Sequence, residues 1–147
     1  MFKHILVPTD GSSMSEQAAA AAIDLARAQG GDIVAVSIAQ PYPMMAAEAM
    51  VVLDAATESR ILLGLAQDNV DKVVQLAQAA GVPCKGVIAM SYFPHDEIIK
   101  AAADNHCDVV FMASHGRHGI GKLLAGSVTQ NVLAYSTLPV MVLRPGH

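Results

Sequence analysis

The residue types that could do chemistry gather in the last third of the chain, where glycines surround the expected start of a helix. The apolar run at residues 109–112 predicts a buried strand, and residues 113–116 predict the loop after it. Gly126 and Ser127 then stand where a helix is expected to begin. Glycines allow the backbone to approach an anion closely, and the free N–H groups of a first helical turn point at it. This stretch therefore predicts an anion-binding loop, with phosphate as the first candidate.

The same loop also fits a P-loop pattern, which we reject. Residues 116–122 match the GxxxxGK spacing, but Leu123 stands where a P-loop has serine or threonine. Without that hydroxyl group the magnesium ligand of a P-loop is missing. Lys122 also falls short of Gly126 and Ser127, the better helix start. We interpret the match as a coincidence.

His115 and His118 raise the alternative of a metal site. Two histidines in one loop, without a third ligand nearby, are a weak metal pattern. We expect them to be exposed loop residues, with Arg117 or His118 available for a phosphate contact. His4 and His95 are expected at the surface. No set of serine, histidine and aspartate, or of cysteine and histidine, shares a plausible location, so no catalytic residue is predicted.

Asp10 stands in a second loop that could contribute to the same site. It follows the apolar strand expected at residues 3–8, in the turn at residues 9–12. An aspartate in such a turn commonly bonds its own backbone as an Asx-turn. A carboxylate at the carboxyl end of a strand also suits a ribose in an α/β sheet, and we favour that role.

Alternating strands and helices would position these loops. Strands are expected at 3–8, 32–39, 84–90, 109–112 and 139–143, and helices at 14–29, 59–80, 94–105 and 127–135, with a short helix or an apolar flap at 44–53. Ser13 with Glu16 fits a capping box for the first helix, Ser127 with Gln130 fits one for the last, and Gly30 would end the first helix. Such alternation predicts one α/β domain with a mostly parallel sheet, covered by helices on both faces.

The composition agrees with a single soluble domain over residues 1–147. Hydrophobic residues make up 53% of the chain and charged residues 15%, which excludes general disorder. The net charge of −4 argues against a nucleic-acid partner, which would need a basic face. With no signal-peptide pattern and no apolar run of transmembrane length, we expect no membrane association and a cytoplasmic location. Cys84 and Cys107 are expected to be inert, unpaired thiols.

Three motifs carry a family resemblance across essentially the whole chain. They are ILVPTDGS near the start, PHDEI at the third long helix, and ASHG followed after residues 117–125 by GSVTQNV. Together they resemble the universal stress protein family, whose nucleotide-binding members have a glycine where this chain has Ala113. The resemblance implies a fold like that of the adenine nucleotide alpha hydrolases, an open five-stranded parallel sheet in the order 3-2-1-4-5.

The resemblance also implies which residues contact an adenine nucleotide. Asp10 would bind the ribose hydroxyl groups or a magnesium ion carried by the nucleotide, and Ile38 would lie against the adenine. Phosphates would be bound mainly by backbone groups near Gly116 and Gly126. The full set of implied contacts is Pro8, Thr9, Asp10, Ile38, Met112, Ala113, His115, Gly116, Arg117, His118, Gly119, Gly126, Ser127, Val128 and Thr129.

We therefore expect a cytoplasmic regulatory protein of the stress response that binds ATP with Mg²⁺, or another adenine nucleotide such as AMP or cAMP. The last apolar strand would form an edge, and the resemblance implies a homodimer through residues 139–144. Two alternatives stay open. One is a slow ATPase, for which no positioned base is found. The other is a partner-binding module that has lost its nucleotide because Ala113 blocks the pocket.

Overall fold

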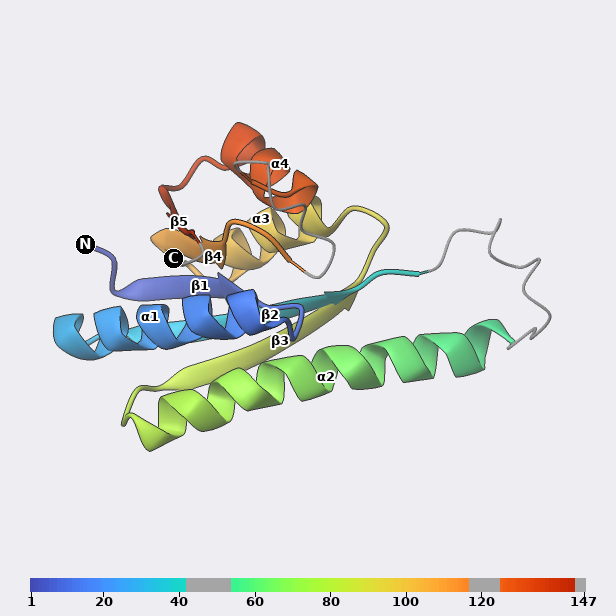
Figure 1. Ribbon diagram of the computed structural model, residues 1–147, viewed down its shortest axis with the longest axis horizontal. Helices are drawn as coiled ribbons and strands as arrows, with labels where there is room; N and C mark the ends of the chain where they lie inside the picture. The colour runs from blue at the N-terminus through green and yellow to red at the C-terminus, as the bar shows by residue number, and fades with distance from the viewer. Residues whose placement is uncertain (42–53, 117–124, 145–147) are drawn as a thin grey trace.

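A computed structural model describes residues 1–41, 54–116 and 125–144. Strands and helices alternate along the chain (Figure 1). In order they are β1 His4–Pro8, α1 Ser13–Gln29, β2 Asp32–Ala39, α2 Ala55–Ala79, β3 Cys84–Met90, α3 Pro94–Asp104, β4 Val109–Ala113, α4 Ser127–Tyr135 and β5 Val140–Leu143. No helix in these ranges is both long enough and apolar enough to cross a membrane. The helix or flap expected at 44–53 lies outside them, as do Arg117, His118, Gly119, Lys122 and Leu123.

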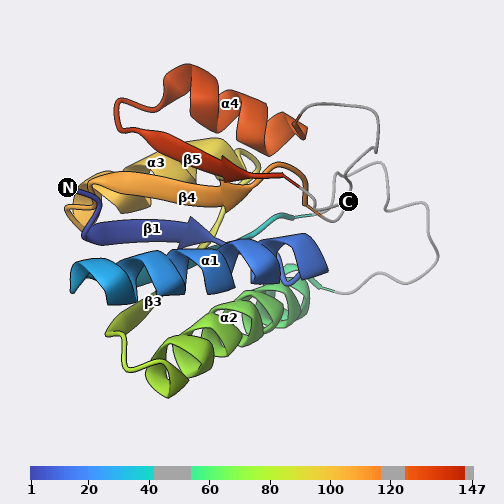
Figure 2. The ribbon, with the colours of Figure 1, turned by 60° about the vertical axis from the view of Figure 1, so that its left-hand side comes forward.

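The strands form one parallel sheet in the order β3-β2-β1-β4-β5, which confirms the expected fold. β1 is central, since its Ile5 pairs with Ile33 of β2 on one side and with Val109 of β4 on the other. α1 and α2 cover one face of the sheet, and α3 and α4 cover the other (Figures 1 and 2). The strand order therefore reverses between β1 and β4.

Alternate residues of the central strands fill two cores, one on each face of the sheet. Ile5 and Val7 pack with Ala22 and other small residues of α1, while Leu6 packs on the opposite face with Ile98 of α3. Because both faces are covered, the central strands are continuous apolar runs rather than alternating ones. Full burial of each such side chain contributes about 1.5–3 kcal/mol.

The start of α1 differs from the expected capping box. Its N-cap is Ser12, whose Oγ accepts a hydrogen bond from the Ser15 N–H at 3.2 Å. The prediction that Ser13 and Glu16 form the cap is therefore wrong. The turn at Asp10 is the physical reason, because it leaves Ser12, one residue earlier, in the extended conformation that a cap requires.

The end of α1 and the start of α2 show what local sequence can and cannot indicate. α1 ends at Gly30 with a φ of 68°, which confirms the expected left-handed cap. α2 begins at Ala55 rather than at 59, because Asp54 caps it by accepting a hydrogen bond from the Thr57 N–H at 2.7 Å. The apolar periodicity that predicted this helix becomes regular only about one turn after Ala55, which is why the predicted start was too late.

β3 and β5 form the two edges of the sheet, as expected. β5 pairs with β4 on one side, from Val140 opposite Val110 to Leu143 opposite Ala113. All residues of β5 are half-buried, so an apolar strand is left partly open along its other side.

Both cysteines are unpaired. Cys84 is half-buried on β3, and Cys107 is buried just before β4. Burial raises the pKa of each thiol from 9.0 to about 11. Thiols of this kind stay protonated at neutral pH and react slowly, which agrees with the expectation of inert cysteines.

Candidate functional site

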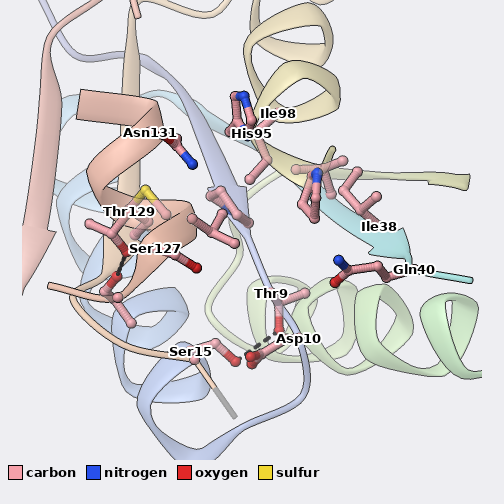
Figure 3. A pocket seen from close by; sticks show the side chains of 18 of the residues that line it. Thr9, Asp10, Ser15, Ile38, Gln40, His95, Ile98, Ser127, Thr129 and Asn131 are labelled. Carbon is pink, nitrogen blue, oxygen red and sulfur yellow. Dashed lines mark hydrogen bonds between the residues drawn. The ribbon is translucent and has the colours of Figure 1, made fainter. Parts of the chain in front are cut away.

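A cavity of about 520 Å³ opens at the carboxyl ends of the strands. In Figure 3, Ser127 and Thr129 lie on one side of it and Ile38 and Gln40 on the other, with Asp10 below and His95 above. The cavity has the size of a small-molecule site. It also lies at the end of the sheet, and at the reversal of strand order, where open α/β sheets bind ligands.

The turn after β1 is fixed by its own side chains. Asp10 Oδ1 accepts a hydrogen bond from the Ser12 N–H at 2.9 Å, so the expected Asx-turn is present. Thr9 Oγ1 accepts one from the Gly11 N–H at 3.2 Å and lies 3.1 Å from the Oγ of Ser15, which is buried in α1. One oxygen of Asp10 thus shapes the turn. A role for this carboxylate in ligand binding is compatible with that bond.

The second carboxylate oxygen of Asp10 lies close to the other candidate loop, the one that contains Gly116. A Cβ atom added at Gly116 would clash with Asp10 Oδ2. The turn after β1 and the loop after β4 therefore touch, as the β2-β1-β4 order predicts. Glycine at position 116 is needed for this close approach.

α4 begins at the cavity without a side-chain cap. Its N-cap is Gly126, and its first turn contains no acidic residue. The predicted capping box is wrong, because Ser127 is already helical and Gln130 Nε2 donates instead to the Ala125 carbonyl at 2.8 Å. α1 and α2, by contrast, are capped by Ser12 and Asp54. The first N–H groups of α4 thus have the arrangement that binds anions.

Short hydrogen bonds fix the start of α4 against the end of β4. Thr129 Oγ1 donates to the Ala113 carbonyl at 2.9 Å, and the Gly126 N–H donates to the Ser114 carbonyl at 2.7 Å. Both Thr129 and Ser114 are buried. The helix N-terminus is therefore held rigidly at the wall of the cavity, which lowers the entropy lost when it binds a ligand.

His115 differs from the exposed loop residue that we expected. Its Nδ1 lies 3.0 Å from Ser114 Oγ, and its Nε2 is buried without a hydrogen-bond partner among the described residues. Ser114 is 0% exposed, so the pair cannot present a nucleophile to a substrate. A buried ring nitrogen without a partner costs about 1–3 kcal/mol, and a ligand can supply the missing bond.

Every predicted contact residue in the described ranges lines this one cavity. They are Pro8, Thr9, Asp10, Ile38, Met112, Ala113, His115, Gly116, Gly126, Ser127, Val128 and Thr129. The predicted contacts Arg117, His118 and Gly119 lie outside the described residues.

Sequence reasoning missed other residues that line the same cavity. They are Ser15, Val36, Gln40, Tyr92, Phe93, Pro94, His95, Ile98 and Asn131. A signal for some of them existed, because Gln40 follows β2 and Tyr92 and Phe93 follow β3, whose carboxyl ends must meet at this edge of a parallel sheet.

The expectation that His95 lies at the surface is wrong. Its side chain is 18% exposed, and its ring stacks on that of Tyr135 with centroids 5.9 Å apart. His4 does lie at the surface, where its Nδ1 is 3.1 Å from Asp32 Oδ2. Among the described residues, no three histidine, cysteine or acidic side chains are grouped in a way that could hold a metal ion.

The sequence of this chain is similar to those of one known protein family. The model of the "Universal stress protein family" matches residues 1–144. The chain belongs to the universal stress protein family. A universal stress protein of Thermus aquaticus is 31% identical over 145 residues, with 98% of this chain and 100% of that protein covered. Universal stress protein MJ0531 of Methanocaldococcus jannaschii is 28% identical, with coverages of 98% and 83%.

Solved universal stress proteins share the fold. The structure of MJ0577 has a TM-score of 0.76 and 27% identity, covering 100% of this chain and 99% of that one. A universal stress protein solved in complex with cAMP has a TM-score of 0.70 and 23% identity, covering 96% of both chains. Another, from Archaeoglobus fulgidus, was solved in complex with dAMP, with a TM-score of 0.63 and 17% identity. At these lower identities the likeness extends to the fold alone.

Proposed function

We propose that this universal stress protein is a cytoplasmic stress-response regulator that binds ATP, or another adenine nucleotide, in the cavity at the carboxyl ends of the strands. The observation that carries the proposal is the uncapped N-terminus of α4, which opens beside the touching Asp10 and Gly116 loops. Related folds solved with cAMP and dAMP support an adenine nucleotide as the ligand class.

The phosphate groups would lie at the start of α4. Gly126 has no side chain to exclude them, and the N–H groups of Ser127 and Val128 belong to the first helical turn. The positive end of the helix dipole favours negative charge at this point. His115 lines the same cavity, and its buried Nε2 lacks a partner among the described residues, so a phosphate oxygen that reached this atom would satisfy it.

The base would lie at the end of β2, where main-chain groups of Ile38 face the cavity side. β1 ends at Pro8, which pairs with Val36, and the Thr9 N–H donates to the Val36 carbonyl at 2.9 Å. Alternate residues of a strand direct their N–H and C=O groups to the same side. Ile38 therefore directs both groups beyond the end of β1. Adenine offers a neighbouring donor and acceptor on one edge, which this pair matches, whereas guanine offers two acceptors there.

Asp10 lies between these two subsites and would bind the ribose or a magnesium ion. β1 is the strand between β2 and β4, so a nucleotide that spans the base and phosphate subsites must cross its end. Mg²⁺ in nucleotide sites keeps several waters and takes one or two carboxylates together with phosphate oxygens. Asp10 supplies a carboxylate suited to that role, and the ion would neutralise part of the phosphate charge.

We expect that Ala113 does not obstruct this arrangement. Ala113 is only 7% exposed, so most of its methyl group is packed inside the protein. Its carbonyl accepts the Thr129 hydroxyl, which fixes the end of β4. This argues against the alternative in which the extra methyl group closes the pocket.

We expect the nucleotide to be held rather than rapidly hydrolysed. A helix N-terminus stabilises charge but transfers no proton, and phosphoryl transfer also needs a positioned nucleophile. Ser114 is buried, and one oxygen of Asp10 is engaged in the turn. Any hydrolysis should be slow beside the roughly 1–100 per second of ordinary kinases.

The proposed assembly is a homodimer through β5. β5 is an apolar edge strand that pairs on one side only with β4, and such edges favour pairing with another chain. A two-fold interface there would use the same surface of both copies.

Titration calorimetry of the nucleotide-free protein tests the ligand. We expect binding of ATP that strengthens with Mg²⁺, weaker binding of GTP, and weaker ATP binding by Asp10→Ala. The Asp24→Ala variant is a matched control, because Asp24 is an exposed carboxylate on α1 that forms an ion pair with Arg27 away from the cavity. If the wild-type protein binds no adenine nucleotide at millimolar concentration, the proposal is wrong and the partner-binding alternative takes its place.

A further inference from the structure

The mouth of the cavity carries exposed aromatic rings that the contacts proposed above leave unused. Tyr92 and Phe93 line the cavity, yet they are 58% and 61% exposed. Aromatic residues make up only 4% of the chain, so placing two in succession in water at this point is not explained by core packing. Large exposed apolar groups at the rim of a pocket mark contact sites.

The backbone and the ring of Phe93 are both held by neighbouring groups. The Phe93 N–H donates to Ser91 Oγ at 3.0 Å, and its carbonyl accepts from the Asp96 N–H at 3.1 Å. The Phe93 ring meets that of His95 edge-on, with centroids 6.5 Å apart, and His95 stacks in turn on Tyr135. A ligand that binds against the Phe93 ring therefore costs that side chain little conformational entropy.

The order of the strands shows which part of a nucleotide these rings would meet. Along the carboxyl edge of the sheet, the ends of β3, β2, β1 and β4 follow one another. They carry Phe93, Ile38, Asp10 and Gly116 respectively. With phosphates at Gly116 and α4, ribose at Asp10 and a base edge at Ile38, the next feature beyond the base is the pair of rings after β3.

We propose that Tyr92 and Phe93 form the outer wall of the base subsite and stack on the purine ring, which makes them specificity-determining residues. This inference rests on the proposed function, because it places the base by the phosphate and ribose subsites. Every base has a π-face, but a purine covers more ring area than a pyrimidine. The site should therefore prefer ATP to CTP, beyond the preference set by hydrogen bonds at Ile38.

The test compares ATP binding by the wild-type protein and by the Tyr92→Ala, Phe93→Ala double variant. Loss of base stacking should raise the Kd for ATP by roughly 5- to 150-fold. The Kd for inorganic tripolyphosphate, which has no base, should not change. A Phe93→Trp variant should keep the affinity for ATP, since a larger ring can stack as well. Leu133→Ala is the matched control, because Leu133 is an exposed apolar residue on α4, 49% exposed, and is not among the residues that line the cavity.

The outcomes separate this inference from the proposed function. ATP binding by the wild-type protein with an unchanged Kd in the double variant would refute the stacking role while leaving the nucleotide site intact. Equal loss of ATP and tripolyphosphate affinity would also refute it, because the damage would then not concern the base. Absence of ATP binding by the wild-type protein would overturn both proposals.

Discussion

Replacing Gly126 by alanine separates the proposed phosphate contact from the fold. Gly126 has a φ of −73° and a ψ of 169°, extended values that any residue adopts. A Cβ atom there would lie 3.6 Å from the Ser114 carbonyl oxygen and 3.7 Å from the Cα of His115, which are ordinary contacts. The protein should therefore fold with alanine at this position, while the methyl group takes space beside the first N–H groups of α4.

The expected free-energy changes differ between folding and binding. At an N-cap, alanine is less favourable than glycine by about 0.5–1 kcal/mol. Alanine also restricts the unfolded chain, which stabilises the folded state by about 0.4–1 kcal/mol. These terms nearly cancel in the free energy of unfolding. Loss of one charge-assisted hydrogen bond to a phosphate weakens binding by about 1.5–3 kcal/mol, which raises the Kd roughly 10- to 150-fold.

Calorimetric titration with MgATP and thermal unfolding of the ligand-free variant measure the two quantities separately. Gly64→Ala is the matched control, since it makes the same chemical change at an exposed glycine of α2 with no atom within 4 Å of the added Cβ. We expect Gly126→Ala to unfold near the wild-type temperature and to bind ATP much more weakly. Wild-type affinity in Gly126→Ala would refute the placement of phosphate at the start of α4.

Three further outcomes are expected. Gly64→Ala should raise the free energy of unfolding by about 0.5–1 kcal/mol in urea denaturation, because alanine is the better residue in a helix interior. The raised pKa values of Cys84 and Cys107 mean that the folded state favours the neutral thiols. Their contribution to the free energy of unfolding is therefore fully present below about pH 9 and is lost as the pH rises towards about 11. Urea denaturation across this range should show a smaller loss in the Cys84→Ala, Cys107→Ala variant, and an equal loss would contradict the assignment. Val142→Lys should produce monomer in light scattering, whereas an unchanged dimer would place the interface away from β5.

Local patterns were sufficient for most of the scaffold because the buried strands are short, continuous apolar runs, whereas the helices show a longer apolar period. The buried run at β4 and the proline at the first position of α3 each needed only neighbouring residues to interpret. The meeting of Asp10 with Gly116 also followed from the sequence, since the strand order implied by the resemblance leaves the two loops side by side. The elements themselves were thus indicated by the sequence, whereas the order of the strands came from the resemblance.

Features that depend on side-chain contacts between distant segments were not predictable. Ser12 and Ser13 are equally good caps by type, and only the hydrogen bond from the Ser12 N–H to Asp10 distinguishes them. His95 resembles a surface residue on α3, and its partial burial involves a ring contact with Tyr135 at the far end of α4. The aromatic rim of the cavity was missed although Tyr92 and Phe93 follow β3, because the sequence does not show that these two residues line the cavity.

The main-chain N–H and C=O groups of one residue, Ser114, connect the outer strand to the start of α4. The Ser114 N–H donates to the Leu143 carbonyl at 2.8 Å, and the Ser114 carbonyl accepts from the Gly126 N–H at 2.7 Å. Two hydrogen bonds therefore join β5 to the start of α4. If the proposed dimer forms through β5, these bonds would link association of the subunits to occupation of the cavity. The factor by which ligand changes the dimerisation constant must then equal the factor by which dimerisation changes ligand affinity.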